Sequence, residues 1–529
     1  MPGENGETYA EKSKKQIAII GAGVSGLLAC KHAREQGFDP IVFESSNGII
    51  GGLWSYTIKS TKLQTPKEFY QFSDFAWPES VTETFPHHDQ VKDYIESYAL
   101  HFNILPHIQF NSKVVSIDYR AYEDDGCDEG LWGGTGQAFS PKRKWLVTVL
   151  NMLRPLDPHK VYEVDFVILC IGRFSGLPNI PNFPMNKGPE VFDGKVIHSM
   201  EYAEIGSVRA TAMVKDKHVT VIGFQKSAID LAAEVARLNG VEHPCTLLLR
   251  TVNWTIPEDF LKISFRNLNR FSEFMIHKPG EGFFLWFLAI LLSPLRWILT
   301  KFVESYLKLI YPLKKYNMVP EHGFLRQISA CKFPVLPGDF YKRVEEGSVI
   351  LKKSKSYCFC KTGLIIDDKE ENLPLKTDVV IFATGYRSDD KLCDIFTSTY
   401  IQKRIVGSSA PFYRECMHPR IPQLAILGYS EGRAMLYTTE IQSKWLAHFL
   451  AGKFKLPTIM EMEEDVLRWE KCMQRYASTY YKRSCASLLL LIYFNDLLCR
   501  DMNLNPRRKK KLLSELFAPY KPSDYQISI

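Results

Sequence analysis

A buried strand, a glycine-rich turn and a helix follow one another twice in this chain, and no other feature constrains the fold as much. The first copy reads QIAIIGAGVSGLLACKHAREQGFDPIVFE, in which the apolar run 17–20 predicts a strand. Gly21 allows the sharp turn, Gly23 lets a pyrophosphate approach the backbone, and Gly26 lets the helix pack closely on the strand. A second strand ends at Glu44, whose carboxylate can accept hydrogen bonds from ribose hydroxyls. The first copy therefore predicts a dinucleotide site.

The second copy, HVTVIGFQKSAIDLAAEVARLNG, departs from this pattern at one position. Gly223 keeps the turn and Ala228 is small enough for helix packing, but Gln225 replaces the middle glycine. Ser227 can donate a hydrogen bond to a phosphate. Arg250 ends the next strand, where the first copy has an acid; an acid repels a 2′-phosphate, whereas an arginine binds it through two hydrogen bonds. We therefore expect FAD at the first site and NADPH at the second, the alternative being that Arg250 is a surface ion-pair partner.

Two further segments, DFVILCIG and DVVIFATG, resemble each other and end at Gly172 and Gly385, the latter preceded by Thr384. Each follows one of the two glycine turns at a similar distance along the chain. In a doubly wound sheet, ligands lie beyond the carboxyl ends of the strands. Each segment is therefore predicted to close the sheet of one nucleotide domain, with its glycine beside the nucleotide.

These patterns predict an α/β fold with two Rossmann-like dinucleotide-binding domains, the second inserted in the first, and a helical C-terminal extension. The expected parts are a disordered N-terminus (1–15), an FAD-binding domain (16–205) that resumes after the insertion (371–455), an NADPH-binding domain (206–370) carrying a long excursion (about 259–336), and the extension (456–529).

Bulk properties indicate a globular chain. Of the 529 residues, 45% are hydrophobic and 24% are charged, and the net charge of +7 is small for this length. The basic run RRKKK (507–511) is interpreted as a solvated tail, so no nucleic-acid partner is expected. Twelve cysteines without paired spacing fit a reducing compartment, and the polar start of the chain carries no apolar signal segment. We therefore expect a cytoplasmic protein. Peripheral attachment to the cytoplasmic side of the endoplasmic reticulum is compatible with this expectation.

The longest apolar block, FFLWFLAILL (283–292), is too short to span a bilayer as a helix. It is interpreted as a buried helix. The alternative is an element at a membrane surface or at the path of substrate access, in contact with lipid but not spanning it.

Several segments in this order resemble the flavin-containing monooxygenases: GAGVSG, GGLW (51–54), FDGKVIHSMEY (192–202), GFQKSA and ATGY (383–386). Phe192, Gly194, His198 and Tyr202 match the identifying pattern F-x-G-x-x-x-H-x-x-x-Y of that family. The resemblance extends from about Gln16 to about Leu450. Within the family the chain is most similar to the plant branch that includes a pipecolate N-hydroxylating enzyme of systemic immunity.

The resemblance implies a reaction cycle and roles for particular residues. NADPH would reduce FAD, reduced FAD would react with O2 to give a flavin C4a-hydroperoxide, and an amine nitrogen or a sulfur of a small molecule would take one oxygen atom.

Gln64 aligns with an asparagine of animal relatives near the flavin and is the candidate catalytic residue, while Lys67 and Asp74 are interpreted as structural. The flavin contacts expected from GGLW come from Gly52, Leu53 and Trp54, although Trp54 is equally well explained as core. His198 is expected on the interdomain linker or beside the nicotinamide. Because Ile171 stands where many relatives have threonine, only backbone contact to the flavin is expected there. No metal site is expected, and the oligomeric state is left open.

Three other classes compete with this interpretation. A disulfide reductase shares both nucleotide domains but needs a redox cysteine pair, and no cysteine lies between Cys30 and Cys127. A Baeyer–Villiger ketone monooxygenase stays open, as does a catalytically silent binding protein in which Gln225 and Gln64 mark lost functions. The intact motif residues favour a working enzyme; these are Gly21, Gly23, Gly26, Glu44 and Arg250.

Overall fold

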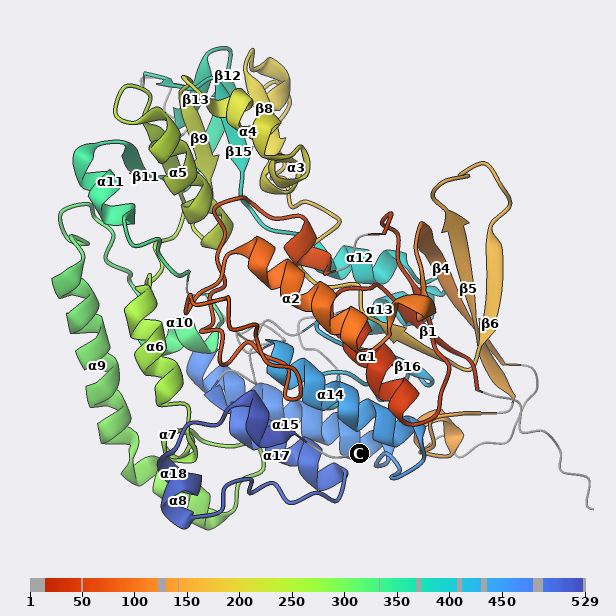
Figure 1. The fold of residues 1–529 in the computed structure, drawn as a ribbon. Coiled ribbons are helices and arrows are strands. Elements are labelled where there is room, and N and C mark those ends of the chain that lie inside the picture. Colours follow the sequence, from red (N-terminus) through yellow and green to blue (C-terminus); the bar gives the residue numbers. More distant parts are fainter. Residues whose placement is uncertain are drawn as a thin grey trace, which may run out of the picture.

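The computed structural model describes residues 15–48, 51–121, 130–140, 142–332, 334–367, 373–406, 412–429, 435–478 and 489–526. The predicted disordered N-terminus (1–15) lies outside this part of the chain except for Lys15. Two five-stranded parallel sheets dominate the structure, and they form two lobes that are joined along one side (Figure 1).

The first sheet contains the first glycine turn. Its strand order is β16-β7-β1-β2-β3, with β1 (Ile17–Ile20), β2 (Ile41–Phe43), β3 (Ile108–Gln109), β7 (Phe166–Leu169) and β16 (Leu424–Ile426). Helix α1 (Val24–Glu35) connects β1 to β2 and packs against α14 (Met435–Leu450). All four residues of β1 are buried, which explains why this strand reads as a continuous apolar run.

The second sheet repeats the arrangement around the second glycine turn. Its order is β11-β10-β9-β15-β8, with β8 (Lys195–His198), β9 (Val219–Ile222), β10 (Cys245–Leu249), β11 (Val349–Lys353) and β15 (Val379–Phe382). Helix α5 (Lys226–Asn239) joins β9 to the parallel strand β10. The predicted α/β fold with two dinucleotide-binding domains, one inserted in the other, is confirmed.

The strand pairing shows that the chain leaves the first sheet, and returns to it, at other residues than those predicted. Strand β8 pairs with β15, and β15 pairs with β9, so both belong to the second sheet. The boundaries expected at 205 and 371 therefore have to move before β8 and beyond β15. The chain returns to the first sheet only at β16. Short apolar strands of the two sheets look alike in sequence, which is why the pattern did not separate them.

Two smaller antiparallel sheets and several helices complete the two lobes. The sheets are β4 (Ser112–Ala121), β5 (Arg143–Asn151) and β6 (Lys160–Val164), and β12 (Tyr357–Cys360), β13 (Gly363–Ile366) and β14 (Leu375–Lys376). The helices are α2 (His88–His101), α3 (Ser199–Glu204), α4 (Ser207–Val214), α11 (Phe340–Glu346), α12 (Ser388–Asp394) and α13 (Thr399–Ile405). Nine of the described cysteines are free thiols, whereas Cys331 is disulfide-bonded and so departs from the expected set of free cysteines.

The predicted insertion forms a helical arm that connects the second nucleotide domain to the C-terminal extension. The arm contains α6 (Glu258–Arg266), α7 (Arg270–Phe274), α8 (Phe283–Leu291), α9 (Ser293–Ile310) and α10 (Phe324–Ser329), and the extension contains α15 (Ile459–Ala477), α17 (Leu491–Asp501) and α18 (Leu512–Phe517). Side chains of α6, α9 and α10 enter the core of the second domain. Helix α10 packs against α15, and α7 packs against α17 and α18.

The interpretation of the apolar block 283–292 as a buried helix is wrong. The block does form a helix, α8, but only Ala289 in it is buried, and Phe283 and Phe284 are 78% and 73% exposed. A helix that is apolar on every side has no polar face to show which side meets solvent, so its sequence did not reveal this. No single described helix meets the length and hydropathy expected of a membrane span, although α8 and α9 meet them together across a 44° bend.

Candidate active site

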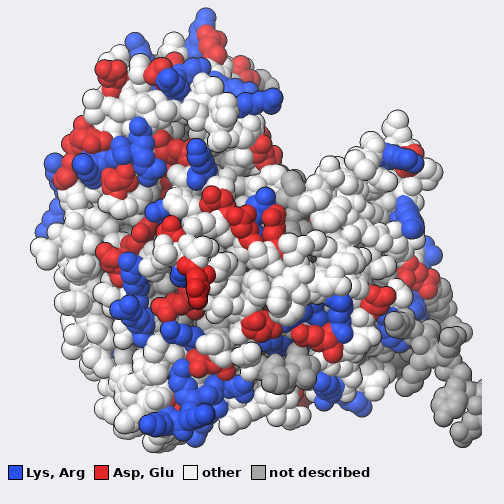
Figure 2. Space-filling view, in the orientation of Figure 1, with Lys and Arg blue, Asp and Glu red and all other residues white. Residues whose placement is uncertain are grey.

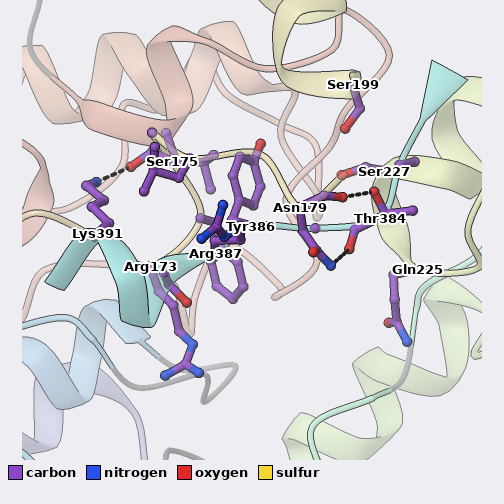
Figure 3. Close-up of a pocket in the computed structure, with 18 of the residues that line it drawn as sticks. Arg173, Ser175, Asn179, Ser199, Gln225, Ser227, Thr384, Tyr386, Arg387 and Lys391 are labelled. Atoms are coloured by element: carbon purple, nitrogen blue, oxygen red, sulfur yellow. Dashed lines mark hydrogen bonds between the residues drawn. The ribbon is translucent and has the colours of Figure 1, made fainter. Parts of the chain in front are cut away.

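A large cavity runs between the carboxyl ends of the strands in the two parallel sheets. Its volume is about 2330 Å³, well above the roughly 300–1,000 Å³ of a pocket for one small ligand. Both glycine turns line it, as do Glu44, Gln64 and Arg250. Figure 3 shows its middle part, where the loops that follow β7 and β15 face the second glycine turn. The cavity is therefore large enough for two dinucleotides and a substrate.

The three glycines of the first turn are required for different reasons. A Cβ atom on Gly21 would lie 2.6 Å from the Cys170 carbonyl oxygen, and one on Gly26 would lie 1.9 Å from the Gly21 carbonyl oxygen. These two glycines are thus needed by the protein's own packing. A Cβ on Gly23 would meet nothing closer than the Gly52 Cα at 3.6 Å, and Gly23 has an ordinary negative φ. The space in front of Gly23 is left open on the cavity side, as a pyrophosphate site requires.

Glu44 is held against this turn by backbone amides. Its Oε2 accepts a hydrogen bond from the Ala22 amide at 2.8 Å, and its Oε1 accepts one from the Ser46 amide at 2.8 Å. Oε1 also accepts a hydrogen bond from the Ser45 hydroxyl at 3.3 Å, whereas Oε2 keeps a further lone pair, and Glu44 lines the cavity. This geometry fits the predicted contact with two ribose hydroxyls.

The segment GGLW folds over the first turn. Gly52 has a φ of +57°, and its backbone lies against Gly23, where a Cβ would come within 3.3 Å. Leu53 is 40% exposed and lines the cavity. Trp54 also lines it and donates from its indole nitrogen to the Tyr70 hydroxyl at 2.9 Å. Tyr70 lines the cavity as well, so the indole is held within the cavity wall, and this position fits both expected roles of Trp54.

The second turn keeps the shape of the first despite Gln225. Gly223 has a φ of +140°, and a Cβ there would lie 2.4 Å from the Ala383 carbonyl oxygen, so this glycine cannot be replaced. Gln225 precedes α5 in an extended conformation that any residue can adopt. Gln225 and Ser227 are both exposed to the cavity, on opposite sides of the turn (Figure 3). The amides of the α5 N-terminus are thus available to a phosphate.

Arg250 lies at the carboxyl end of β10 and lines the cavity. It forms no ion pair within the described part of the chain, so the alternative of a surface ion-pair partner finds no support there. Lys355 and Ser356, which no sequence motif marks, also line the cavity. They follow β11, which runs parallel to β10, so their position could have been inferred once the strand order was known. Burial raises the pKa of the neighbouring Tyr357 to about 12, and the charge of Arg250 opposes this shift.

Gln64 lies on a segment that connects the two nucleotide domains. The Ser60 amide donates to Glu234 of α5 at 3.1 Å, and the Thr61 hydroxyl donates to Asp230 of α5 at 3.4 Å. Gln64 itself is half-buried and lines the cavity, and its side-chain amide forms no hydrogen bond with another described residue. Its donors and acceptor are therefore free for a ligand.

Lys67 and Asp74, from the same sequence motif, have no place at the site. Lys67 donates to the Val81 carbonyl oxygen, and Asp74 pairs with Lys31 in the interior. Neither residue lines the cavity. Their positions match the structural role expected for them.

The loops after β7 and β15 meet in the middle of the cavity, although each of these strands lies inside its sheet and does not close it as predicted. Asn179 donates from its side-chain amide to the Thr384 carbonyl oxygen at 3.1 Å, and its backbone amide donates to the Gly385 carbonyl oxygen at 2.9 Å (Figure 3). On the other side, Lys391 of α12 donates to the Ile171 carbonyl oxygen at 2.6 Å, directly before Gly172. Burial lowers the pKa of Lys391 to about 8, and Glu44 opposes this shift. Asn179 and Lys391 had no motif that could have revealed them.

His198 is placed differently from the other candidates. It ends β8, is 1% exposed and does not line the cavity. Its Nδ1 accepts a hydrogen bond from the Met200 amide at 3.2 Å and caps α3, and its ring packs edge-on against Tyr386. Burial lowers its pKa. Tyr202, from the same identifying pattern, donates to Glu234 of α5 at 3.2 Å. The pattern thus joins β8 and α3 to α5, and His198 supports the loop 383–386 from behind.

Comparison with known proteins identifies the class to which this chain belongs. Residues 14–507 match the family model described as flavin-binding monooxygenase-like. The chain is 36% identical over 527 residues to the "Probable flavin-containing monooxygenase 1" of Arabidopsis thaliana, covering 98% of this chain and 97% of the relative. It is 35% identical to the "Putative flavin-containing monooxygenase 2" of the same plant, covering 94% and 99%. The chain therefore belongs to the flavin-containing monooxygenase family, and it is an enzyme that uses FAD and NADPH.

Solved structures support the fold independently of close sequence similarity. Cyclohexanone monooxygenase superposes with a TM-score of 0.66 at 15% identity, covering 92% of this chain and 97% of that one. The S-allyl-L-cysteine S-oxygenase of Allium sativum superposes with a TM-score of 0.56 at 19% identity, covering 93% and 89%. At these identities the two likenesses support the fold alone.

Proposed function

We propose that this monooxygenase hydroxylates the nitrogen of a small cyclic amino acid, and that pipecolic acid is the substrate to test first. The family establishes oxygenation of nitrogen or sulfur in small molecules. Bound FAD and NADPH supply the reducing equivalents and the activated oxygen. The chain has to bind the substrate, exclude water and orient the reacting nitrogen. The resemblance to the plant branch that includes a pipecolate N-hydroxylating enzyme supports this substrate.

The observation that carries the proposal is the position of Lys62 and Gln64, two residues apart on the segment that connects the two domains. Both residues line the cavity. Lys62 forms a bridge with His87, so the chain is extended here and side chains two residues apart point to the same side. The Lys62 ammonium has no ion-pair partner among the described residues. An unpaired cation beside a free amide can hold a carboxylate while the amide hydrogen-bonds at the reacting centre.

Replacing Lys62 by glutamine should weaken binding of an amino acid much more than binding of the matching amine. Loss of a charge-assisted hydrogen bond should raise the KM for pipecolate about 10- to 100-fold. Piperidine, which has the same ring without the carboxylate, should show less than about a threefold change. The measurement is substrate-stimulated NADPH oxidation, with products identified by mass.

The matched control is Lys113→Gln, which removes another cavity-lining lysine from β4. Equal losses for pipecolate and piperidine in the Lys62 variant would contradict the carboxylate contact. A panel that also contains a thioether amino acid and a cyclic ketone tests the substrate class. A sulfoxide or a lactone as the main product would overturn N-hydroxylation and would favour S-oxygenation or the Baeyer–Villiger alternative.

We further propose that Gln64 keeps oxygen transfer coupled to NADPH oxidation. In Gln64→Ala, NADPH should still be consumed, but most of the oxygen should leave as hydrogen peroxide, because the free amide at the reacting centre is lost. Gln64→Asn keeps the amide on a shorter chain and should restore part of the coupling. Gln225→Ala, which changes the other cavity-lining glutamine, should alter the KM for NADPH and leave coupling intact. Unchanged peroxide release in Gln64→Ala would remove this residue from the reacting centre.

A further inference from the structure

The outer surface of the helical arm is far more apolar than a water-exposed surface normally is. On α8 and α9 the side chains of Phe283, Phe284, Phe287, Trp297, Ile298, Phe302 and Leu309 are each at least 50% exposed. On α18, Leu512 and Leu513 are both 72% exposed and Phe517 is 50% exposed. Contiguous exposed apolar surface of this kind marks a site of association.

The two apolar parts are fixed to one another. Helix α7 contacts both α8 and α18, and the Phe271 ring packs on the Phe517 ring at 5.2 Å. The Asn269 side chain donates to the Phe517 carbonyl oxygen at 3.1 Å. Arg270 of α7 pairs in the interior with Asp496 and Glu515. Helix α7 therefore connects α18 to α8, which in turn contacts α9.

Basic side chains border the apolar surface. The run 507–511 is not the solvated tail that the sequence suggested, because Arg508 donates to the Asp524 carbonyl oxygen at 2.9 Å and Lys509 pairs with Asp524 at 2.8 Å. Arg507, Lys510 and Lys511 are exposed and form no ion pair with other described residues. Figure 2 shows basic side chains gathered at the lower edge, over α18, and largely uncharged surface over α9.

The acidic residues of α9 and α18, Glu304 and Glu515, are buried and do not reach this surface. Glu304, the one acidic residue between 283 and 310, is buried, pairs with Lys301 at 2.7 Å and accepts from the Phe324 amide at 3.0 Å. Glu515 of α18 is buried in the pairing with Arg270. The surface thus presents apolar and cationic groups together, which is the composition of a helix surface that binds anionic lipid headgroups.

We propose that α8, the outer side of α9, α18 and the cations Arg507, Lys510 and Lys511 form a membrane-docking face. The protein lies on an anionic membrane surface with the aromatic and leucine side chains in the headgroup region. It does not span the bilayer, because Ala289, Glu304 and Leu307 anchor α8 and α9 in the protein core and a span would have to pull them out. This inference does not depend on the identity of the substrate.

A second copy of the chain is the competing occupant, and charge argues against it. A two-fold dimer through this face brings the same patch of each copy together. Arg507, Lys510 and Lys511 would then border an interface with the same cations of the other copy, without acidic partners nearby. A negatively charged lipid surface satisfies these cations, whereas a second copy repels them.

The test is flotation of the flavin-loaded full chain with phosphatidylcholine vesicles, prepared with and without phosphatidylserine. We expect strong binding to the phosphatidylserine vesicles that weakens as salt is added, and weaker binding to the neutral vesicles. Fluorescence of the exposed Trp286 and Trp297 should shift to the blue on binding, because their indoles leave water.

Two variants separate the apolar and the charged contributions. Phe284→Ser/Trp297→Ser should reduce binding to both kinds of vesicle at least about tenfold. Lys510→Glu/Lys511→Glu should reduce binding to phosphatidylserine vesicles at least about tenfold and leave binding to neutral vesicles nearly unchanged. The matched control, Arg154→Glu/Leu156→Ser, changes an exposed cation and an exposed leucine on the turn between β5 and β6 and should bind like the wild type. NADPH oxidase activity without vesicles should be retained in all three and shows that they are folded.

Two results with the wild-type protein would overturn the proposal, and one comparison with the variants would do the same. One is wild-type protein that stays unbound on phosphatidylserine vesicles. The other is a concentration-dependent dimer that Phe284→Ser/Trp297→Ser dissociates while vesicle binding is absent, which would assign the face to a second copy. Equal binding by wild type and both variants would also place the lipid contact elsewhere.

Discussion

Gly23→Ala should yield a folded protein that no longer retains FAD. The protein itself tolerates this methyl group, because the nearest atom to a Cβ at Gly23 is the Gly52 Cα at 3.6 Å and the φ is ordinary. The methyl would occupy the space in which a pyrophosphate has to approach the backbone. The loss is therefore in cofactor binding and not in folding. The measurement is the flavin absorbance of the purified variant, together with its thermal unfolding temperature.

Two other glycine variants make this result specific. Gly338→Ala adds a methyl group in open space and should keep both FAD and stability. Gly26→Ala places a methyl group 1.9 Å from the Gly21 carbonyl oxygen and should destabilise the fold by about 1–3 kcal/mol. A Gly23→Ala protein that keeps its full complement of FAD would show that the pyrophosphate lies elsewhere.

Arg250→Ala should raise the KM for NADPH by about 30- to 100-fold and the KM for NADH by less than about threefold. An arginine bound to a phosphate through charged hydrogen bonds contributes about 2–3 kcal/mol, and only NADPH carries the 2′-phosphate. Arg250 is free for this contact because it pairs with no described acid. Steady-state oxidation of both nucleotides at fixed substrate provides the comparison.

Arg237→Ala is the matched control for this variant. Arg237 belongs to the same domain, but it pairs with Asp339 on the surface and does not line the cavity. Its removal should leave both KM values unchanged. If Arg250→Ala weakens NADPH and NADH equally, Arg250 does not recognise the 2′-phosphate and another cavity cation, such as Lys355, takes that role.

The sequence predicted the parts of the fold that depend on local geometry. At Gly21, Gly26 and Gly223 a methyl group would clash with a backbone carbonyl oxygen, so only glycine fits. The glycine pattern therefore indicates the path of the backbone at both turns. Glu44 and Arg250 follow buried strands, and parallel strands end at one edge of a sheet. These rules were sufficient to predict two dinucleotide domains, and most of the predicted site residues do line the cavity.

Features that depend on long-range packing were not predictable in this way. Strand β15 pairs with both β8 and β9 across long stretches of chain, and nothing in the apolar sequences of these strands distinguishes the two sheets. Asn179 and Lys391 reach the cavity from loops whose positions follow only from the assembled domains. Whether α8 is exposed depends on which other elements pack against it. A helix that is apolar on every side does not indicate these contacts in its sequence.

Reduction of the purified full chain by NADPH in the absence of oxygen tests most directly whether one cavity holds both dinucleotides. We expect a yellow protein whose flavin absorbance is bleached by stoichiometric NADPH and recovers when oxygen is admitted. A chain that stays colourless after incubation with excess FAD, or that holds FAD which NADPH does not reduce, would contradict the account.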